Sequence, residues 1–252
     1  MHTKRRTLLI VLPLLVVGTG IGTAALRALS QEKQLGNQEA AITEKQREHS
    51  RLYKEYNTGK RISELVAEMG DVRIRRNSPL SGGDPTGFSA DPHEFLRGLV
   101  CDADAVLIGK VKDKSSHMSE DESFVYTDYE MSVTKVLKDN SAAHIEADAD
   151  ISITRPGGVI RVNGRTVEAI DNSFAPLTVK GHYLVFLRFM PVTATYRALG
   201  SQGSFELRGK EINKLTKESL PLDNVATSKN VDSFVNEIHI ALASGCSKGN
   251  TQ

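Results

Sequence analysis

Cysteine is scarce in this chain, and neither sign of charge is in excess. The 252 residues include two cysteines, and 32 basic side chains stand against 31 acidic ones, which gives a formal net charge of +1. Two cysteines exclude a disulfide-dense miniature scaffold and a zinc site made of four Cys ligands. The near balance of charge excludes a nucleic-acid-binding domain that relies on bulk positive charge.

Sequence motifs of the common catalytic and cofactor sites are also missing. The seven histidines form neither an HExxH nor an HxH pattern, and no GxSxG motif of a serine nucleophile occurs. Gly157-Gly158 and Gly200–Gly203 lack the spacing of phosphate-binding loops, so we interpret them as turns. The acidic run Glu120–Glu122 lacks the spacing and the glycine of an EF-hand loop. We therefore expect no catalytic residue, no cofactor and no metal ion.

The chain begins with a basic cluster followed by a long uncharged run. Lys4–Arg6 precede the uncharged residues 7–26, a stretch long enough for an α-helix to cross a bilayer. Positive charge before the run favours a cytoplasmic N-terminus. We therefore predict that residues 1–30 are either a signal anchor, which holds the chain in the membrane through residues 7–26, or a cleaved signal peptide. Both alternatives export residues 31–252, which then face the periplasm from the inner membrane or are secreted.

Residues 31–76 are rich in Gln, Glu, Lys, Arg and Ala, which favour helix, and we expect a helical spacer there. Four residues recur at a spacing of seven: Leu35, Ile42, His49 and Tyr56. The intermediate seam positions are polar, so the spacer is either a solvated helix or a stalk that dimerises through residues 31–69. Glycines and prolines are dense in residues 77–90, which indicates a linker and a domain boundary.

Residues 91–252 change from helical to alternating patterns. Asp91-Pro92-His93-Glu94 is a strong helix start, since Asp caps a helix and Pro suits its first position. From Ser123 to Leu137 the odd positions are mostly apolar, which predicts a long strand with its even positions, including Asp128 and Glu130, in water. Asn163-Gly164 between two short β-type runs is typical of a type I′ hairpin turn.

The same domain ends with further strands and a helix. Tyr183–Phe189 is nearly all apolar and predicts a central, buried strand. Ser204–Arg208 and Glu211–Lys214 predict a last hairpin. Ser228–Ser244 has an amphipathic helical pattern whose apolar face continues to Cys246. We therefore expect a β domain that closes with a C-terminal helix.

Five stretches carry a resemblance to known proteins: FVYTDYE (124–130), KVLK (135–138), ITRPGG (153–158), PLTVKGHYLVFL (176–187) and QGSFEL (202–207). In these stretches the chain resembles a family of uncharacterised exported bacterial β-barrel proteins. More remotely, it is similar to the netrin-like module of tissue inhibitors of metalloproteinases, which has an OB-fold. The inhibitory activity of that module depends on an N-terminal Cys, whereas Cys101 lies mid-chain, so the activity does not carry over.

The resemblance implies a mainly β fold: an OB-like or netrin-like Greek-key β-barrel with a short N-terminal helix and a C-terminal amphipathic helix. A transmembrane helix and a helical spacer would precede this barrel. Cys101 comes before its first strand and Cys246 at the end of its last helix. Because two thiols in one exported domain commonly pair in an oxidising compartment, we expect a disulfide between them.

The expected function is binding without catalysis. OB-type barrels commonly bind ligands on one face of the sheet, here around Tyr126, Asp128, Glu130 and Arg155. We expect an envelope protein that binds a protein, a peptide or a glycan, and no nucleic acid. Two alternatives remain: an extracytoplasmic enzyme with an unfamiliar site, and an architectural protein that dimerises through residues 31–69.

Overall fold

The computed structural model describes residues 43–53, 59–76, 91–200, 202–215 and 230–246. The chain divides into two units, residues 1–41 and 42–252, and every described residue belongs to the second unit. The predicted membrane segment, residues 1–30, and the predicted linker, residues 77–90, lie outside the described residues. Within the described ranges, no helix is both long enough and apolar enough to span a membrane.

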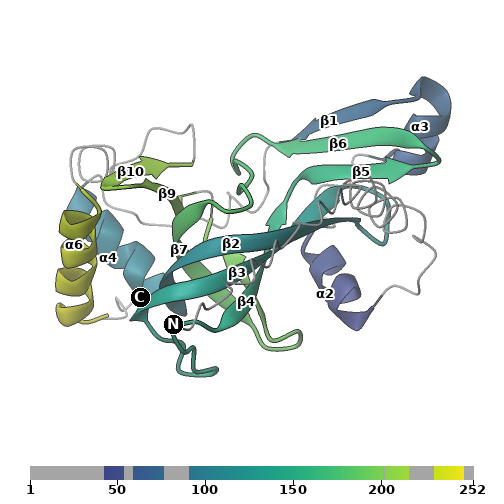
Figure 1. The fold of residues 1–252 in the computed structure, drawn as a ribbon. Helices are drawn as coiled ribbons and strands as arrows, with labels where there is room; N and C mark the ends of the chain where they lie inside the picture. Colours follow the sequence, from purple (N-terminus) through teal and green to yellow (C-terminus); the bar gives the residue numbers. More distant parts are fainter. Residues whose placement is uncertain (1–42, 54–58, 77–90, 201, 216–229, 247–252) are drawn as a thin grey trace, which may run out of the picture. The chain divides into compact units, whose positions relative to one another are not determined.

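The described part is mainly β, and most of its strands belong to one larger sheet (Figure 1). Its strand order is β10-β9-β7-β2-β3-β4-β8. The strands are β2 (Ala105–Met118), β3 (Val125–Lys138), β4 (Asp150–Pro156), β7 (His182–Met190), β8 (Thr195–Ala198), β9 (Ser204–Arg208) and β10 (Glu211–Lys214). β8 pairs in parallel with β4 and also antiparallel with β7, so the hydrogen-bonded series from β7 through β2, β3, β4 and β8 returns to β7.

The predicted strands of this sheet agree with the structure in their central residues. The apolar strand over 183–189 lies inside β7 and is almost entirely buried, as its composition predicts. β2 continues to Met118 through a run of mostly polar residues. The polar end of β2 is held as a strand by its pairing with β3, from Met118 opposite Val125 back to Val106 opposite Lys138.

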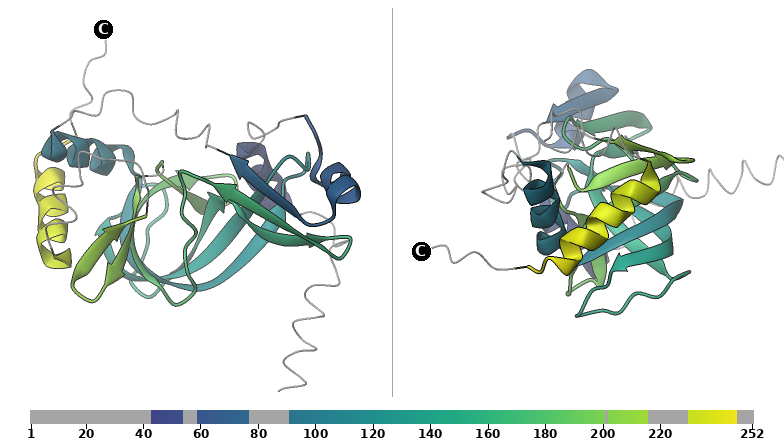
Figure 2. Two further views of the ribbon diagram at one scale, coloured as in Figure 1. Left: turned by 90° about the horizontal axis from the view of Figure 1, so that it is seen from above. Right: turned by 90° about the vertical axis from the view of Figure 1, so that its left-hand side faces the viewer.

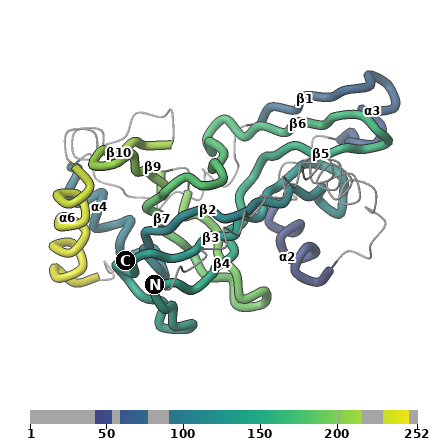
Figure 3. Tube along the Cα trace, in the orientation of Figure 1, coloured from purple at the N-terminus to yellow at the C-terminus, as the bar shows by residue number. Residues whose placement is uncertain are grey.

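A smaller sheet has the order β1-β6-β5, with β1 (Val72–Arg76), β6 (Arg165–Asp171) and β5 (Gly158–Val162). β1 runs parallel to β6 although about ninety residues separate them in the chain, and Figure 3 shows the two side by side. Asn163 and Gly164 both have positive φ (51° and 77°), and they join β5 to β6 as the hairpin that the Asn-Gly pair predicts.

The predicted helical spacer, residues 31–76, is helical in two segments of the part that the structure describes and ends in a strand. The described residues of this range form α2 (Glu44–Leu52), α3 (Ile62–Met69) and strand β1, and they belong to the same unit as the β domain. β1 follows a period of two, since Val72 and Ile74 are buried and Arg73 is exposed. Those buried residues join a hydrophobic cluster with residues of β5 and β6, and this long-range packing overrides the local helical preference.

Two helices, α4 (Pro92–Asp102) and α6 (Val231–Ala243), pack against each other and on the larger sheet (Figure 2). Asp91 caps α4 by accepting hydrogen bonds from the N–H groups of the first turn, and Asn230 caps α6. Their apolar faces share one core with strands β7 and β9. Cys101 in α4 is bonded to Cys246, with Cα atoms 5.4 Å apart, so the structure contains the expected disulfide. Cys246 follows α6 and does not belong to its apolar face.

Candidate functional site

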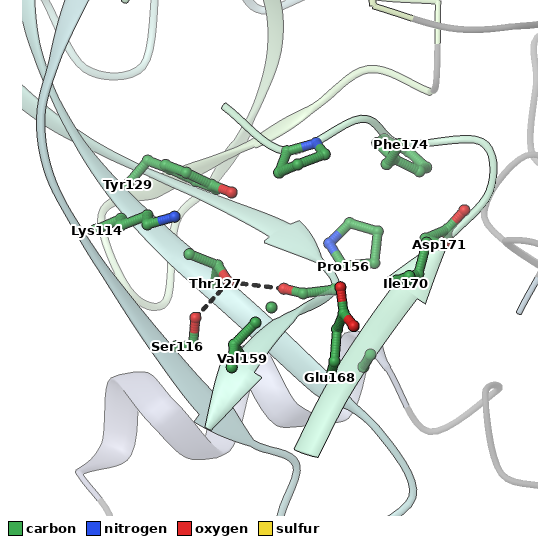
Figure 4. Close-up of a pocket in the computed structure, with 14 residues that line it drawn as sticks. Lys114, Ser116, Thr127, Tyr129, Pro156, Val159, Glu168, Ile170, Asp171 and Phe174 are labelled. Atoms are coloured by element: carbon green, nitrogen blue, oxygen red, sulfur yellow. Dashed lines mark hydrogen bonds between the residues drawn. The ribbon is translucent and has the colours of Figure 1, made fainter. Parts of the chain in front are cut away.

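A cavity of about 210 Å³ lies where the two sheets meet (Figure 4). Every strand from β2 to β6 contributes to its wall, together with the segment that follows β6. The lining residues are Lys114, Ser116, Thr127, Tyr129, Pro156, Gly157, Gly158, Val159, Glu168, Ala169, Ile170, Asp171, Phe174 and Pro176. The cavity is therefore built from residues that only long-range strand pairing brings together.

The Pro156-Gly157-Gly158 segment carries the chain from the larger sheet into the smaller one. Gly157 and Gly158 have φ of 90° and 151°, which side-chain-bearing residues rarely adopt. A Cβ atom at Gly158 would overlap the hydroxyl oxygens of Ser116 and Thr127. Thr127 Oγ1 donates a hydrogen bond to the Gly157 carbonyl (2.6 Å) and accepts one from Ser116 Oγ (2.8 Å). This glycine pair thus forms a turn, and it lets the backbone approach the cavity wall closely.

The cavity wall combines apolar surface with a few charges. Tyr129, Phe174 and two prolines contribute apolar side chains to the wall, as do Val159 and Ile170. Glu168 is ion-paired with Arg73, and Asp171 accepts a hydrogen bond from the backbone N–H of Ser173 (2.8 Å). Such a mixture, apolar walls with a small number of polar groups, is typical of a site that binds a small molecule or one group of a larger partner.

Arg155 contacts the cavity-lining residue Phe174 but does not itself line the cavity, and it is almost completely buried, with 2% of its surface exposed. Its guanidinium carbon is 5.3 Å from the centre of the Phe174 ring, a cation–π contact. None of the three guanidinium nitrogens has a hydrogen-bond partner within the described residues. Burial lowers the pKa of Arg155, since removal from water disfavours its charged form. An arginine in this condition is uncommon, because buried charges normally have partners.

The predicted binding face does not exist as a single exposed surface. Tyr126 is fully buried, Asp128 is largely buried, and only Glu130 is exposed. The register places Arg155 opposite Thr127, whereas Asp128 is opposite Thr154. Arg155 therefore points to the other side of the sheet from Tyr126, Asp128 and Glu130. The expectation that these four residues share one face is wrong, because successive strand residues alternate between faces.

Helix α2 covers the face on which Tyr126 and Asp128 lie. His49, with no exposed surface, donates from Nδ1 to Asp128 Oδ1 (2.8 Å), and its Nε2 is 2.8 Å from Thr195 Oγ1. Tyr126 Oη donates to the Gln46 carbonyl (3.1 Å). No pattern in the sequence identifies His49 as a partner of Asp128, since 79 residues separate them.

The order of carboxylate, imidazole and hydroxyl in Asp128, His49 and Thr195 is also that of hydrolytic triads. Here the hydroxyl is not accessible to a substrate: Thr195 is 4% exposed, and Thr193 Oγ1 lies 2.6 Å from its oxygen. The hydrogen bonds among these three side chains connect α2 to strands β3 and β8. We therefore assign this group a structural role.

Aromatic contacts extend this interface. The Tyr53 ring stacks on Tyr126 with centroids 5.2 Å apart, and Tyr53 Oη is 3.1 Å from Thr154 Oγ1. Burial raises the pKa of both tyrosines. Gln46 Nε2 donates to His117 Nδ1 (3.0 Å), and burial lowers the pKa of His117. The N-terminal part of the described chain is thus an integral layer of the domain.

Comparison with known proteins provides no further guide to the site. No family model matches the chain, and no curated protein matches it. In the parts of the chain that the structure describes, no group of three or more His, Cys, Asp or Glu side chains is placed to hold a metal ion. The chemistry of the cavity and of Arg155 therefore has to indicate the function.

Proposed function

We propose that this chain is a non-enzymatic binding protein of the cell envelope, and that the cavity between its two sheets is the binding site. The observation that carries the proposal is the cavity itself, with aromatic and proline walls and the buried Arg155 beside it. Its size, about 210 Å³, is below the roughly 300–1,000 Å³ of sites for drug-sized ligands. The ligand is accordingly a small molecule, or one terminus or side chain of a larger partner.

The proposal includes a small OB-like barrel in the extracytoplasmic compartment. The return of the strand series from β8 to β7 supports the barrel, and such barrels commonly present a binding site on the sheet. The disulfide supports the compartment, because disulfides persist in oxidising environments. Residues 7–26 supply an export or anchoring segment.

Binding is a better interpretation of this cavity than catalysis. In the β2–β3 register, Ser116 is opposite Thr127 and His117 is opposite Tyr126. Ser116 and Thr127 line the cavity, so His117 faces the other side of the sheet, where α2 also holds His49. The two imidazoles near this part of the sheet, which are the usual general bases, are thus directed away from the cavity.

The test is a small-molecule binding screen with two matched tryptophan variants. Val159 lines the cavity and is 57% exposed, whereas Val192 is 70% exposed and lies outside the residues that line it. We expect ligand-observed NMR with a library of small polar and aromatic compounds to find binders to the full-length chain. Val159→Trp should abolish that binding by filling the cavity, and Val192→Trp should leave it intact. Binders that are insensitive to Val159→Trp, or a library without binders, would contradict the proposal.

A further inference from the structure

We infer that acid weakens the attachment of helix α2 to the larger sheet, and that the contact between Gln46 of α2 and His117 of β2 is the acid-sensitive element. This inference is independent of the cavity, because His117 lies on the other side of the sheet. Three observations carry it: the hydrogen bond between the two side chains, the fixed orientation of the Gln46 amide, and the charged groups around His117.

The capping box of α2 fixes the orientation of the Gln46 amide. Gln46 Oε1 accepts a hydrogen bond from the backbone N–H of Thr43 (2.9 Å), while the Gln46 backbone N–H donates to Thr43 Oγ1 (3.2 Å). A backbone N–H can only donate, so the amide atom that faces it has to be the oxygen. The amide nitrogen Nε2, which is a donor, therefore faces His117.

This orientation decides which form of His117 the contact accepts. Gln46 Nε2 lies 3.0 Å from His117 Nδ1, and because Nε2 donates, Nδ1 has to be the unprotonated acceptor. A protonated imidazole carries hydrogen on both ring nitrogens, so two donors would face each other. Reversing the Gln46 amide would restore a hydrogen bond to His117, and it would break the capping box at Thr43. Protonation of His117 thus removes either a contact of α2 with the sheet or part of the N-terminal cap of α2.

The other imidazole at this interface lacks this property. The ring nitrogens of His49 lie 2.8 Å from Asp128 Oδ1 and 2.8 Å from Thr195 Oγ1. The Thr195 hydroxyl can donate to a neutral ring or accept from a protonated one, and the Asp128 oxygen accepts in both cases. Protonation of His49 therefore keeps both contacts. We assign the acid sensitivity to His117 for this reason.

The groups that face His117 come from α2 and β3. Burial has the largest effect on His117 and lowers its pKa, because removal from water disfavours the protonated ring. Asp128 of β3, with Oδ2 3.9 Å from His117 Nε2, opposes this shift, whereas Lys45 and His49 of α2 add to it. The Tyr126 ring of β3 lies against the imidazole with centroids 5.5 Å apart. His117 is thus held in its neutral form while α2 is attached.

Acid therefore favours the state in which α2 is detached. A group whose pKa is lowered in the attached state binds protons more readily once α2 leaves, so the detached state gains as the pH falls below about 6.5. Loss of one hydrogen bond corresponds to a roughly three- to tenfold change in an equilibrium constant. Since the contacts of His49 and the stacking of Tyr53 on Tyr126 persist, we expect α2 to open more often rather than to leave the sheet permanently.

Hydrogen–deuterium exchange of the full-length chain, measured by mass spectrometry, reports this opening. The measured quantity is the protection factor of peptides that cover α2, in which the effect of pH on the exchange chemistry cancels. We expect the protection of α2 to fall by roughly three- to tenfold between about pH 7.5 and about pH 5, the range in which histidine titrates. Constant protection over this range would overturn the inference.

Gln46→Glu tests the assigned contact by reversing its preference. Glu also suits the third helical position of a capping box, so the cap at Thr43 is kept. Its carboxylate attracts a protonated His117, so the protection of α2 should no longer fall as the pH decreases. The matched control is Arg47→Gln, which changes the charge of α2 by the same amount at an exposed position and should keep the pH dependence of the parent. Equal falls in Gln46→Glu and in the parent would overturn the inference.

A second variant tests His117 itself and decides the inference if Gln46→Glu does not fold. Asn takes up no proton in this range, and its side-chain oxygen can accept the hydrogen bond from Gln46. In His117→Asn the protection of α2 should therefore change much less with pH than in the parent. The same fall as in the parent would show that another group responds to the acid, and the assignment to His117 would be wrong.

Discussion

Breaking the Cys101–Cys246 disulfide should lower the free energy of unfolding by about 2–5 kcal/mol. The bond joins residues 145 positions apart, and the chain-entropy model gives about 5 kcal/mol for a loop of that length. That figure is an upper value, because an unfolded chain that retains structure loses less entropy on cross-linking. The helices themselves remain packed, since Leu99 of α4 and Phe234 and Ile238 of α6 lie in one buried cluster. The reduced protein should therefore fold, with lower stability.

The assay is urea unfolding of the full-length chain, oxidised and reduced, beside a Cys101→Ser/Cys246→Ser double variant. We expect the reduced parent and the double variant to unfold at similar urea concentrations, both below that of the oxidised parent. Reductant should not affect the double variant, which controls for other effects of the reagent. A difference below about 1 kcal/mol between oxidised and reduced parent, or labelling of both thiols without reductant, would refute the reasoning.

Three further predictions concern α2 and the Pro-Gly-Gly turn. His49→Ala should lower stability by about 1–3 kcal/mol in urea unfolding, because Asp128 loses its hydrogen-bond partner under α2; an unchanged midpoint would refute the structural role. Since burial lowers the pKa of His117 below its ordinary value of 6.5, the folded state binds fewer protons there than the unfolded state. Stability should therefore fall as the pH decreases through 6.5 and level off below the folded-state pKa, and His117→Asn should show a smaller fall; identical pH profiles would contradict this. Gly158→Ala should melt well below Gly164→Ala, because both have positive φ and only Gly158 faces an overlap; equal melting temperatures would show that the backbone moves away freely.

Local signals in the sequence predict much of the fold. The Asp91-Pro92 start, the Asn163-Gly164 turn and the apolar run of β7 each depend on neighbouring residues alone, and each agrees with the structure. The two cysteines could be paired because no other partner exists for either of them in the chain. These features need no knowledge of which distant strands meet.

The candidate site could not be predicted in the same way. Arg155 is a charged residue, and its burial depends on Phe174 and on the pairing of β4 with β3. Tyr126 and Asp128 lie on the same face of β3, as strand alternation predicts. That face is not open to solvent, because helix α2 covers it, and His49 of α2 is far from Asp128 in the sequence. β1 likewise becomes a strand through its pairing with β6. Contacts between segments far apart in the sequence determine the burial of Arg155, the covering of Tyr126 and Asp128, and the strand conformation of β1. Sequence periodicity does not reveal such contacts.

The most direct test of the central claim is ligand-observed NMR with the small-molecule library on the full-length chain and on its Val159→Trp variant. If the cavity between the two sheets is the binding site, the parent chain binds members of the library and Val159→Trp abolishes that binding. Binding that persists in Val159→Trp would show that the ligands are held elsewhere, and the account of this cavity would be wrong.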